Sequence, residues 1–318
     1  MTREQLEHQQ IPLYFVVVLA AALLGLCLPA IAAHGEWLIS PALALLMYVM
    51  FLQLPLFELR QGLRQGRFIA ALLMANFIFV PLLVWLASRS LLGHPALLIG
   101  ALLVLLTPCI DYVVVFTQLG KGDASLTLAA TPLLLVVQLL LLPLYLALMV
   151  DTQWVLELPL TPFIEAFLGL IAVPLGLALL TLATARRRAA VAAWNQACSW
   201  LPVPAMALVL LLVVASQIGK VAADWPGIVP VLPVYLGFAV LAPALGLLSA
   251  RLWRLPQAQT RSLMFSSATR NSLVVLPLAL ALPAELRSLA AAAVVCQTLV
   301  ELLAELAYIR VLPRLVRG

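Results

Sequence analysis

The sequence predicts an all-α membrane protein of ten transmembrane helices, arranged as two inverted five-helix repeats in which helices 4 and 9 are broken and cross. Three observations predict this fold class. Hydrophobic residues make up 65% of the 318 residues and charged residues 10%, against roughly 45–50% and about 25% in soluble domains. Ten apolar runs approach the length of about 20 residues that crosses a bilayer. Two of these runs are interrupted at mid-span by polar clusters, so we expect residues 1–318 to form one integral membrane domain.

The first five runs form one repeat, from about residue 12 to residue 150. Each is a mostly apolar stretch that can cross the hydrocarbon core as a helix. The runs are Pro12–Ala33, Trp37–Leu54, Phe68–Ser88, Pro95–Leu119 and Leu126–Val150. The first run ends in small residues that resemble a cleavage site, but Glu4 and Glu7 make the preceding segment acidic as well as basic. We therefore expect this run to be retained as a helix.

The other five runs form the second repeat, from about residue 162 to residue 312. The runs are Pro162–Ala183, Trp200–Ile218, Ile228–Ala250, Ser262–Leu282 and Leu286–Leu312. A weak internal similarity at an offset of roughly 160 residues relates the two repeats and makes Gln138 the counterpart of Glu301. Five helices per repeat is an odd number, so the second repeat enters the membrane in the opposite sense. Prolines within the runs are compatible with membrane helices, because neighbouring helices satisfy the freed backbone groups.

The distribution of Lys and Arg predicts the orientation. Most of them flank the termini and the even-numbered connections, among them Arg3, Arg186, Arg187, Arg188 and Arg314. The positive-inside rule then places both termini in the cytoplasm of a multi-pass protein of the inner (plasma) membrane. The net charge of +5 is accounted for by loops that face anionic lipid, so the sequence gives no reason to expect a nucleic-acid partner.

The two polar interruptions predict a transport site. They are Thr107-Pro108-Cys109-Ile110-Asp111 and Ser266-Ser267-Ala268-Thr269-Arg270-Asn271-Ser272. A helix broken inside a bilayer frees backbone groups, which are tolerated only in protein or beside a cavity. Breaks at matching positions of two inverted halves are typical of secondary transporters, whose site lies between them. The alternative is a pair of proline-kinked helices without a site.

Asp111 and Arg270 are ionisable residues at membrane depth, where each needs a partner. We expect them to form an ion pair across the two breaks. The pair is either purely structural or exchanges partners when substrate or a proton arrives. Asn271 and Ser272 follow Arg270 and are candidates for substrate binding together with Cys109, Asp111 and Arg270.

Gln297, Glu301 and Glu305 follow one another at intervals of four residues and share one face of the last helix. Such a polar face points into the bundle, and burial favours the neutral form of a carboxyl group, which suits a proton-coupling site. Glu301 is favoured because it lies near mid-span, whereas Glu305 could reach the interface; Asp111 is a third candidate. Supporting cavity residues are Pro108, Thr131, Gln138 and Gln297, and lesser ones are Gln53, Asn76 and Thr127.

Cys109 is the one cysteine beside a break and a charge. Its thiolate could bind a soft metalloid such as trivalent arsenic, or the residue could simply allow close packing. The four cysteines show no spacing typical of a disulfide framework or a structural metal site, and the histidines fall near the ends of the runs. We therefore expect neither a resident metal nor a cofactor.

These motifs resemble the bile acid/arsenite/riboflavin transporter superfamily over nearly the whole chain. Thr107-Pro108-Cys109, Gly120-Lys121-Gly122-Asp123 and Leu299-Val300-Glu301 resemble most the arsenite efflux permeases of arsenical resistance. Arg270-Asn271-Ser272 resembles the Gln-Asn-Ser motif in helix 9 of the bile acid:sodium symporter branch. The resemblance implies ten helices, inverted repeats and a substrate site at the crossing of helices 4 and 9.

Several positions depart from these relatives. The positions that match a Glu and a Gln of the sodium-coupled members are Ser266 and Arg270, so a fixed guanidinium occupies the place of a cation. The positions that match a Ser-Asn pair after the helix 4 break are Val113 and Val114. Leu273 stands where arsenite permeases have a glutamate. The departures favour protons over sodium as the coupling ion, or no coupling ion.

The sequence thus predicts a secondary active transporter that works by alternating access. The leading hypothesis is an antiporter for proton-coupled efflux of arsenite or a related small solute. The alternative is a bile acid:sodium symporter-like carrier of a small organic anion, which would bind Arg270 and a half-helix N-terminus. An intramembrane enzyme is the remote alternative, and we expect the chain not to be an enzyme, because no H-E-x-x-H motif, Asp-rich motif or Ser/His dyad occurs at membrane depth.

Overall fold

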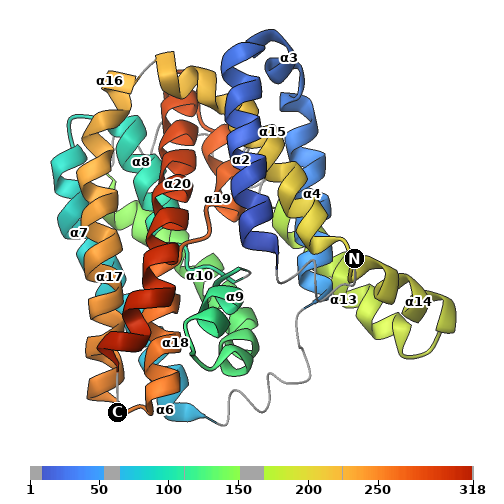
Figure 1. Ribbon diagram of the computed structural model, residues 1–318, viewed down its shortest axis with the longest axis vertical. Helices are drawn as coiled ribbons and strands as arrows, with labels where there is room; N and C mark the ends of the chain where they lie inside the picture. The colour runs from blue at the N-terminus through green and yellow to red at the C-terminus, as the bar shows by residue number, and fades with distance from the viewer. Residues whose placement is uncertain (1–8, 54–64, 111, 151–167, 224, 317–318) are drawn as a thin grey trace. The chain divides into compact units, whose positions relative to one another are not determined.

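A computed structural model describes residues 9–53, 65–110, 112–150, 168–223 and 225–316. The regular elements of this part of the chain are all helical (Figure 1). The chain divides into two compact units. Unit 1 comprises Met1–Gln53, Leu160–Trp225 and Leu280–Leu282, and unit 2 comprises Leu54–Pro159, Pro226–Ala279 and Pro283–Gly318.

Unit 1 is built around the packing of its first helix on its last. Its elements are α2 (Gln10–Cys27), α3 (Pro29–His34), α4 (Glu36–Leu52), η3 (Leu168–Ala172), α13 (Val173–Ala185), α14 (Ala189–Cys198) and α15 (Pro202–Ala223). α2 packs on α15, and a Cβ atom at Gly25 would lie 2.2 Å from the carbonyl oxygen of Ala215. A small residue here permits close approach of the two backbones, as is usual between membrane helices.

Two features of unit 1 differ from the predicted runs. The first run is split at Leu28, because Pro29 favours the first turn of a new helix, α3. α14 was expected to be a connection, yet it is a helix that bends by 49° into the first part of α15. The first residues of the sixth predicted run, 162–167, lie outside the described residues.

Unit 2 holds both predicted breaks. Its elements before α16 are α6 (Gly66–Met74), η1 (Ala75–Phe79), α7 (Val80–Ser88), η2 (Arg89–Leu91), α8 (Pro95–Leu105), α9 (Val113–Leu119) and α10 (Ala124–Met149). α16 (Trp225–Ile228) then leads through η4 (Val229–Val231) to α17 (Leu232–Leu252), α18 (Gln257–Ala268), α19 (Ser272–Leu280) and α20 (Ala284–Leu315). α17 and α20 lie beside each other (Figure 1). α8 packs closely on α20, since a Cβ at Gly100 would lie 2.6 Å from the carbonyl oxygen of Ala290.

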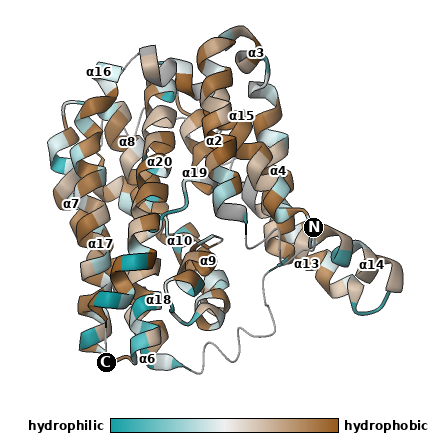
Figure 2. Ribbon diagram, viewed as in Figure 1, coloured by the Kyte–Doolittle hydropathy of each residue, from teal (hydrophilic) through white to brown (hydrophobic). Residues whose placement is uncertain are grey.

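The described helices include four that are long and apolar enough to cross a membrane, or five if the bent pair of α14 and α15 counts as one span. The four are Gly66–Leu91, Ala124–Met149, Trp225–Leu252 and Ala284–Leu315. Shorter apolar helices cover Pro12–Cys27, Trp37–Leu52, Pro95–Leu105 and Val173–Ala185. Figure 2 shows hydrophobic residues along most of these helices. An all-helical membrane protein is therefore confirmed, while ten spans in two inverted repeats remain a prediction.

Hydroxyl groups satisfy carbonyls that prolines leave without a donor. Proline has no N–H, so the carbonyl four residues earlier lacks its usual helical partner. In three places a side chain supplies the missing donor, as expected for a helix in lipid. The bonds are Tyr145 Oη to the Phe77 oxygen before Pro81 (2.6 Å), Thr131 Oγ1 to the Leu128 oxygen before Pro132 (2.8 Å), and Tyr308 Oη to the Ala239 oxygen before Pro243.

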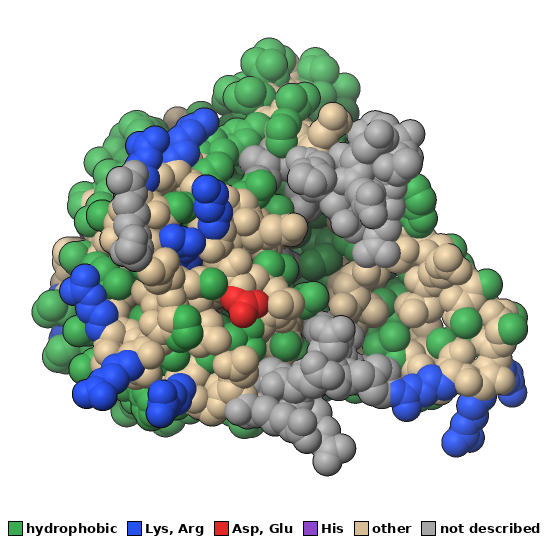
Figure 3. Space-filling model, turned by 60° about the horizontal axis from the view of Figure 1, so that its bottom comes forward, with side chains coloured by type: hydrophobic (Ala, Val, Ile, Leu, Met, Phe, Trp, Pro, Cys, Tyr) green, Lys and Arg blue, Asp and Glu red, His purple; other side chains and the backbone are tan. Residues whose placement is uncertain are grey.

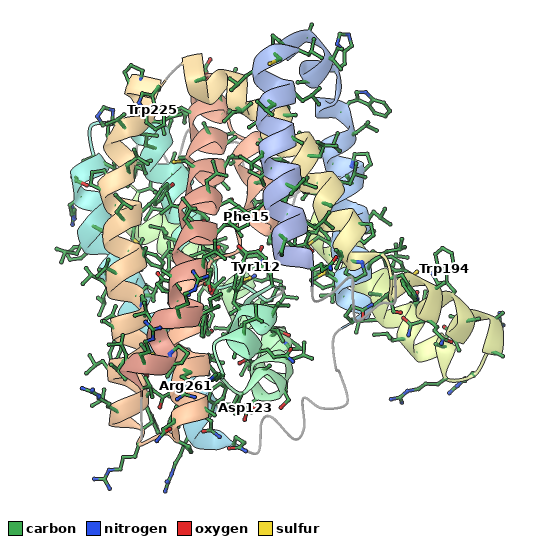
Figure 4. All side chains as sticks on the ribbon, in the orientation of Figure 1. Phe15, Tyr112, Asp123, Trp194, Trp225 and Arg261 are labelled. Atoms are coloured by element: carbon green, nitrogen blue, oxygen red, sulfur yellow. The ribbon has the colours of Figure 1, made fainter. Side chains whose placement is uncertain are left out.

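One end of unit 2 gathers basic side chains (Figure 3). There Arg261 donates from Nη1 to the Lys121 carbonyl oxygen (3.0 Å) and from Nη2 to the Val316 carbonyl oxygen (2.7 Å). The main-chain N–H of Asp123 donates to Ser262 Oγ (2.7 Å), so the turn between α9 and α10 is tied to α18 (Figure 4). This is the end that the sequence predicts to be cytoplasmic.

Candidate functional site

The two predicted breaks lie side by side in unit 2. Pro108 and Arg270 form an antiparallel β-bridge. The N–H of Cys109 donates to the Thr269 oxygen (3.1 Å), and the N–H of Asn271 donates to the Thr107 oxygen (2.8 Å). Each break therefore satisfies backbone groups of the other, which a bilayer would leave unpaired. The crossing of the two interrupted segments is formed as the sequence predicts.

A threonine ends the helix before each break in the same way. Thr107 Oγ1 donates to the Leu103 oxygen and Thr269 Oγ1 to the Phe265 oxygen, each at 2.7 Å and four residues back. Such bonds compete with the helical pattern and favour its end. Pro108 adds a second cause, since a residue before proline avoids the helical region. The C-terminal ends of α8 and α18, which carry partial negative charge, are thereby placed at the crossing.

Arg270 is fully buried, and its guanidinium lies among neutral oxygens. Nη2 donates to Asn76 Oδ1 (2.8 Å) and to the Ser266 oxygen (2.6 Å), and Nη1 lies 3.5 Å from the Leu105 oxygen. The ring of Phe238 lies 5.6 Å from Cζ. Asp111 lies outside the described residues, so its pairing with Arg270 stays a prediction. The sequence named Asn76 only as a lesser candidate, because nothing in its own helix marks it as a partner of Arg270.

Glu301 is buried beside the break between α18 and α19 and accepts three hydrogen bonds. Its Oε1 accepts from Tyr112 Oη (2.7 Å), and its Oε2 accepts from the N–H of Arg270 (2.8 Å) and from Gln297 Nε2 (2.5 Å). Tyr112 Oη also lies 3.0 Å from the Arg270 oxygen. Sequence reasoning missed Tyr112, although its place one residue after Asp111 in the break is a usable signal. Tyr112 and Asp123 flank α9 at its opposite ends (Figure 4).

Glu305 corrects one expectation. The sequence leaves open whether Glu305 reaches the membrane–water interface, but the side chain is 0% exposed. Its Oε1 lies 2.6 Å from Thr269 Oγ1, and its Oε2 is buried without a hydrogen-bond partner among the described residues. α20 is long enough to keep this turn inside unit 2, so all three members of the polar face point inward. Gln297 and Glu301 are each 3% exposed.

Several predicted site residues carry buried polar atoms that have no hydrogen-bond partner in the described part of the chain. At the crossing these are Arg270 Nε, Asn271 Nδ2, Ser272 Oγ and Gln297 Oε1. An unpaired buried polar group costs about 1–3 kcal/mol, so it calls for a ligand, an ion or water. Asn271 Oδ1 accepts from the N–H of Val274 (3.1 Å) at the start of α19, which leaves the amide N–H₂ of Asn271 as a donor for a ligand or water.

The remaining predicted residues fall into two groups. Cys109 is 0% exposed within the crossing, and Pro108 forms the β-bridge. Thr131 and Gln138 are buried on α10. Thr131 bonds within its own helix, and both amide atoms of Gln138 lack a partner among the described residues. No direct bond from Gln138 to the crossing occurs within the described ranges, so its expected role as a supporting cavity residue stays a prediction.

A crossing of two broken apolar helices, with buried unpaired polar atoms and buried carboxyl groups, defines a membrane transporter. Comparison with protein families agrees. The model of the Sodium Bile acid symporter family matches residues 40–224, more than half of the chain. The chain therefore belongs to this family and is a multi-pass membrane transporter. A search of the curated proteins gives no match. The matched residues include the break at Pro108 and end before α18 and α20.

Proposed function

We propose that this transporter exports arsenite or a related small solute in exchange for protons. It works by alternating access in the inner membrane, with both termini in the cytoplasm. The observation that carries the proposal is the set of uncharged buried polar atoms without partners at the crossing, which are Asn271 Nδ2, Ser272 Oγ and Gln297 Oε1. The set offers a donor, a hydroxyl and an acceptor, all uncharged. It suits a small neutral solute with several hydroxyl groups.

Cys109 favours arsenite among such solutes. Trivalent arsenic is soft and binds thiolates, while its hydroxyl groups can hydrogen-bond with amides and hydroxyls. The backbone of Cys109 is held at the crossing by its bond to Thr269. In the described part of the chain no group of three or more His, Cys, Asp and Glu side chains could hold a metal ion. A single thiol at the crossing would bind the metalloid weakly enough to release it, as a transport cycle requires.

Arg270 favours protons over sodium as the coupling ion. Its guanidinium already places positive charge among the carbonyl oxygens at the C-terminal ends of α8 and α18. A sodium ion at this point would have to compete with the positively charged guanidinium of Arg270. Glu301 and Glu305 are buried carboxyl groups beside the same break, and a carboxyl group at this place can exchange a proton during the cycle.

A carrier of a small organic anion is the second candidate. The Nε atom of Arg270 has no hydrogen-bond partner among the described residues and could donate to a carboxylate. The guanidinium has few other free donors for an anion, because Nη2 already donates to Asn76 Oδ1 and to the Ser266 oxygen.

The test uses everted membrane vesicles from a strain without arsenite exporters. An inward-acid pH gradient in sodium-free buffer should drive arsenite uptake by the wild type and not by C109S. C296S is the matched control, because Cys296 is also buried in unit 2 but lies on α20. Equal uptake by wild type and C109S contradicts the thiol-ligand proposal. Uptake of small carboxylates but not arsenite would favour the second candidate, and an absolute need for sodium would contradict proton coupling.

A further inference from the structure

The hydroxyl group of Thr269 faces two acceptor oxygens. Thr269 Oγ1 lies 2.7 Å from the Phe265 carbonyl oxygen and 2.6 Å from Glu305 Oε1. A threonine hydroxyl has one proton to donate and two lone pairs to accept with. Both distances are in the range of O–H···O bonds and are too short for unbonded oxygens. Thr269 donates to Phe265, whose carbonyl carries no proton, so the second bond needs a proton from Glu305.

The second oxygen of Glu305 agrees with a neutral acid. Glu305 Oε2 is buried and has no hydrogen-bond partner among the described residues. An ionised carboxylate offers about four lone-pair positions and is costly to bury without donors. A protonated carboxyl group needs one acceptor for its O–H and leaves only a carbonyl oxygen unpaired. Thr269 Oγ1 supplies that acceptor.

Glu301, one helical turn earlier, has the opposite surroundings. Three donors converge on it, from Tyr112, the Arg270 backbone and Gln297. Two of them are N–H groups, which can only donate. Tyr112 Oη lies closer to Glu301 (2.7 Å) than to the Arg270 oxygen (3.0 Å), so its proton points to the carboxylate. These contacts suit an anion.

We infer that Glu305 holds the exchanged proton, as a carboxylic acid that donates to Thr269, while Glu301 stays ionised. The inference rests on the proposed proton exchange. It assigns the exchanged proton to Glu305, whereas the sequence analysis favours Glu301. When the site opens to one side, the Glu305 O–H bond breaks and the proton passes to water. A proton from water on the other side restores that bond. Among the described residues, the ionisable groups that face Glu305 are Glu301 and Tyr308, both on α20.

Tyr308 does not compete for this role. Its hydroxyl donates to the Ala239 oxygen on α17, and its ring packs edge-on against Phe265. Tyr308 therefore closes the site on the side of α17 and α18, whereas Thr269 connects Glu305 to the break. A change of conformation at the break would alter the acceptor on which the Glu305 proton depends.

Infrared spectroscopy of the purified wild type, E305Q, E301Q and T269V tests the assignment. The wild type and E301Q should show the C=O stretch of a buried carboxylic acid at neutral pH, and E305Q should lack it. T269V should keep the band at a higher frequency, because the acid loses its hydrogen-bond acceptor. The assignment is overturned if E305Q keeps the band or if the wild type has none.

Thermal unfolding provides a second measurement on the same proteins. The folded wild type binds one proton more than the unfolded chain, so its stability should fall as pH rises. E301Q should keep this fall, and E305Q, which replaces the acid by an amide of nearly the same shape, should lose it. A fall in E305Q equal to that of the wild type contradicts the inference. If the band and the fall appear while a pH gradient drives no arsenite transport, the proposed function fails and the protonation assignment stands.

Discussion

Arg270→Met is the substitution that tests the crossing most directly. It keeps much of the apolar volume of the side chain and removes the buried guanidinium. The Asn76 Oδ1 and Ser266 oxygens then lose donors at 2.8 Å and 2.6 Å, and the Leu105 oxygen loses its contact at 3.5 Å. Each hydrogen bond to a charged group contributes about 1.5–3 kcal/mol, and only two are short. Relief of the guanidinium's own desolvation offsets part of this loss, so we expect a net destabilisation of about 3–5 kcal/mol.

The assay is thermal unfolding of the purified protein in detergent. At about 2–4 °C per kcal/mol, the midpoint of Arg270→Met should fall by on the order of 10 °C in choline chloride. Sodium chloride at the same concentration should restore part of the loss, because the exposed oxygens and the C-terminal ends of α8 and α18 form a site for a small cation. The wild type should show no such sodium effect.

Arg310→Met is the matched control, because Arg310 also lies in unit 2 but is exposed on α20. Its free energy of unfolding should stay within about 0.5 kcal/mol of the wild-type value in both salts. If Arg270→Met unfolds at the wild-type temperature, the guanidinium does not hold the crossing together. If it is destabilised and sodium does not restore it, the guanidinium does not stand in the place of a cation.

Two further predictions concern the turn that ties α9 and α10 to α18. Gly120→Ala should destabilise the protein by about 1–3 kcal/mol, because the added Cβ would lie 2.1 Å from the ring of Phe265. Gly237→Ala is the control and should be neutral or stabilising, because a Cβ there meets open space. Equal unfolding midpoints for the two variants would contradict the close packing at Gly120. Asp123→Ala should cost about 0.5–2 kcal/mol of stability in the same assay, because the Asp123 side chain caps α10 by accepting from the N–H of Leu126 (3.0 Å). Asp123→Asn should retain most of this stability, because an Asn side chain also caps a helix. An Asn variant as unstable as the Ala variant would show that the charge, and not the cap, matters.

Local patterns in the sequence predict much of what the structure contains. Each of the ten apolar runs contains helical residues, because a continuous apolar stretch leaves its backbone no other partner in lipid. Both interruptions appear as breaks, since Pro108 and the polar residues around Arg270 work against a continuous helix. The inward face of α20 is also a local property, because a spacing of four residues places Gln297, Glu301 and Glu305 on one side.

The partners of the site residues depend on the tertiary structure. The sequence predicts that Arg270 pairs with Asp111, which lies outside the described residues, and the described hydrogen-bond partners of the guanidinium are Asn76 and carbonyl oxygens of α8 and α18. α14 is a helix where a connection was expected, because composition alone does not distinguish a short exposed helix from a loop. Family membership establishes a transporter, while its substrate and its coupling ion are proposals.

The sequence by itself determines that this is a helical membrane protein with two interrupted segments and buried carboxyl groups, because hydropathy and helical periodicity act over a few neighbouring residues. Only the tertiary structure decides that Thr269 lies within 2.6 Å of Glu305 and that Arg270 N–H bonds to Glu301. Those contacts join residues 31 and 36 positions apart. Their distances depend on how α20 packs beside the break, which no local pattern encodes, and they determine which carboxyl group can hold a proton.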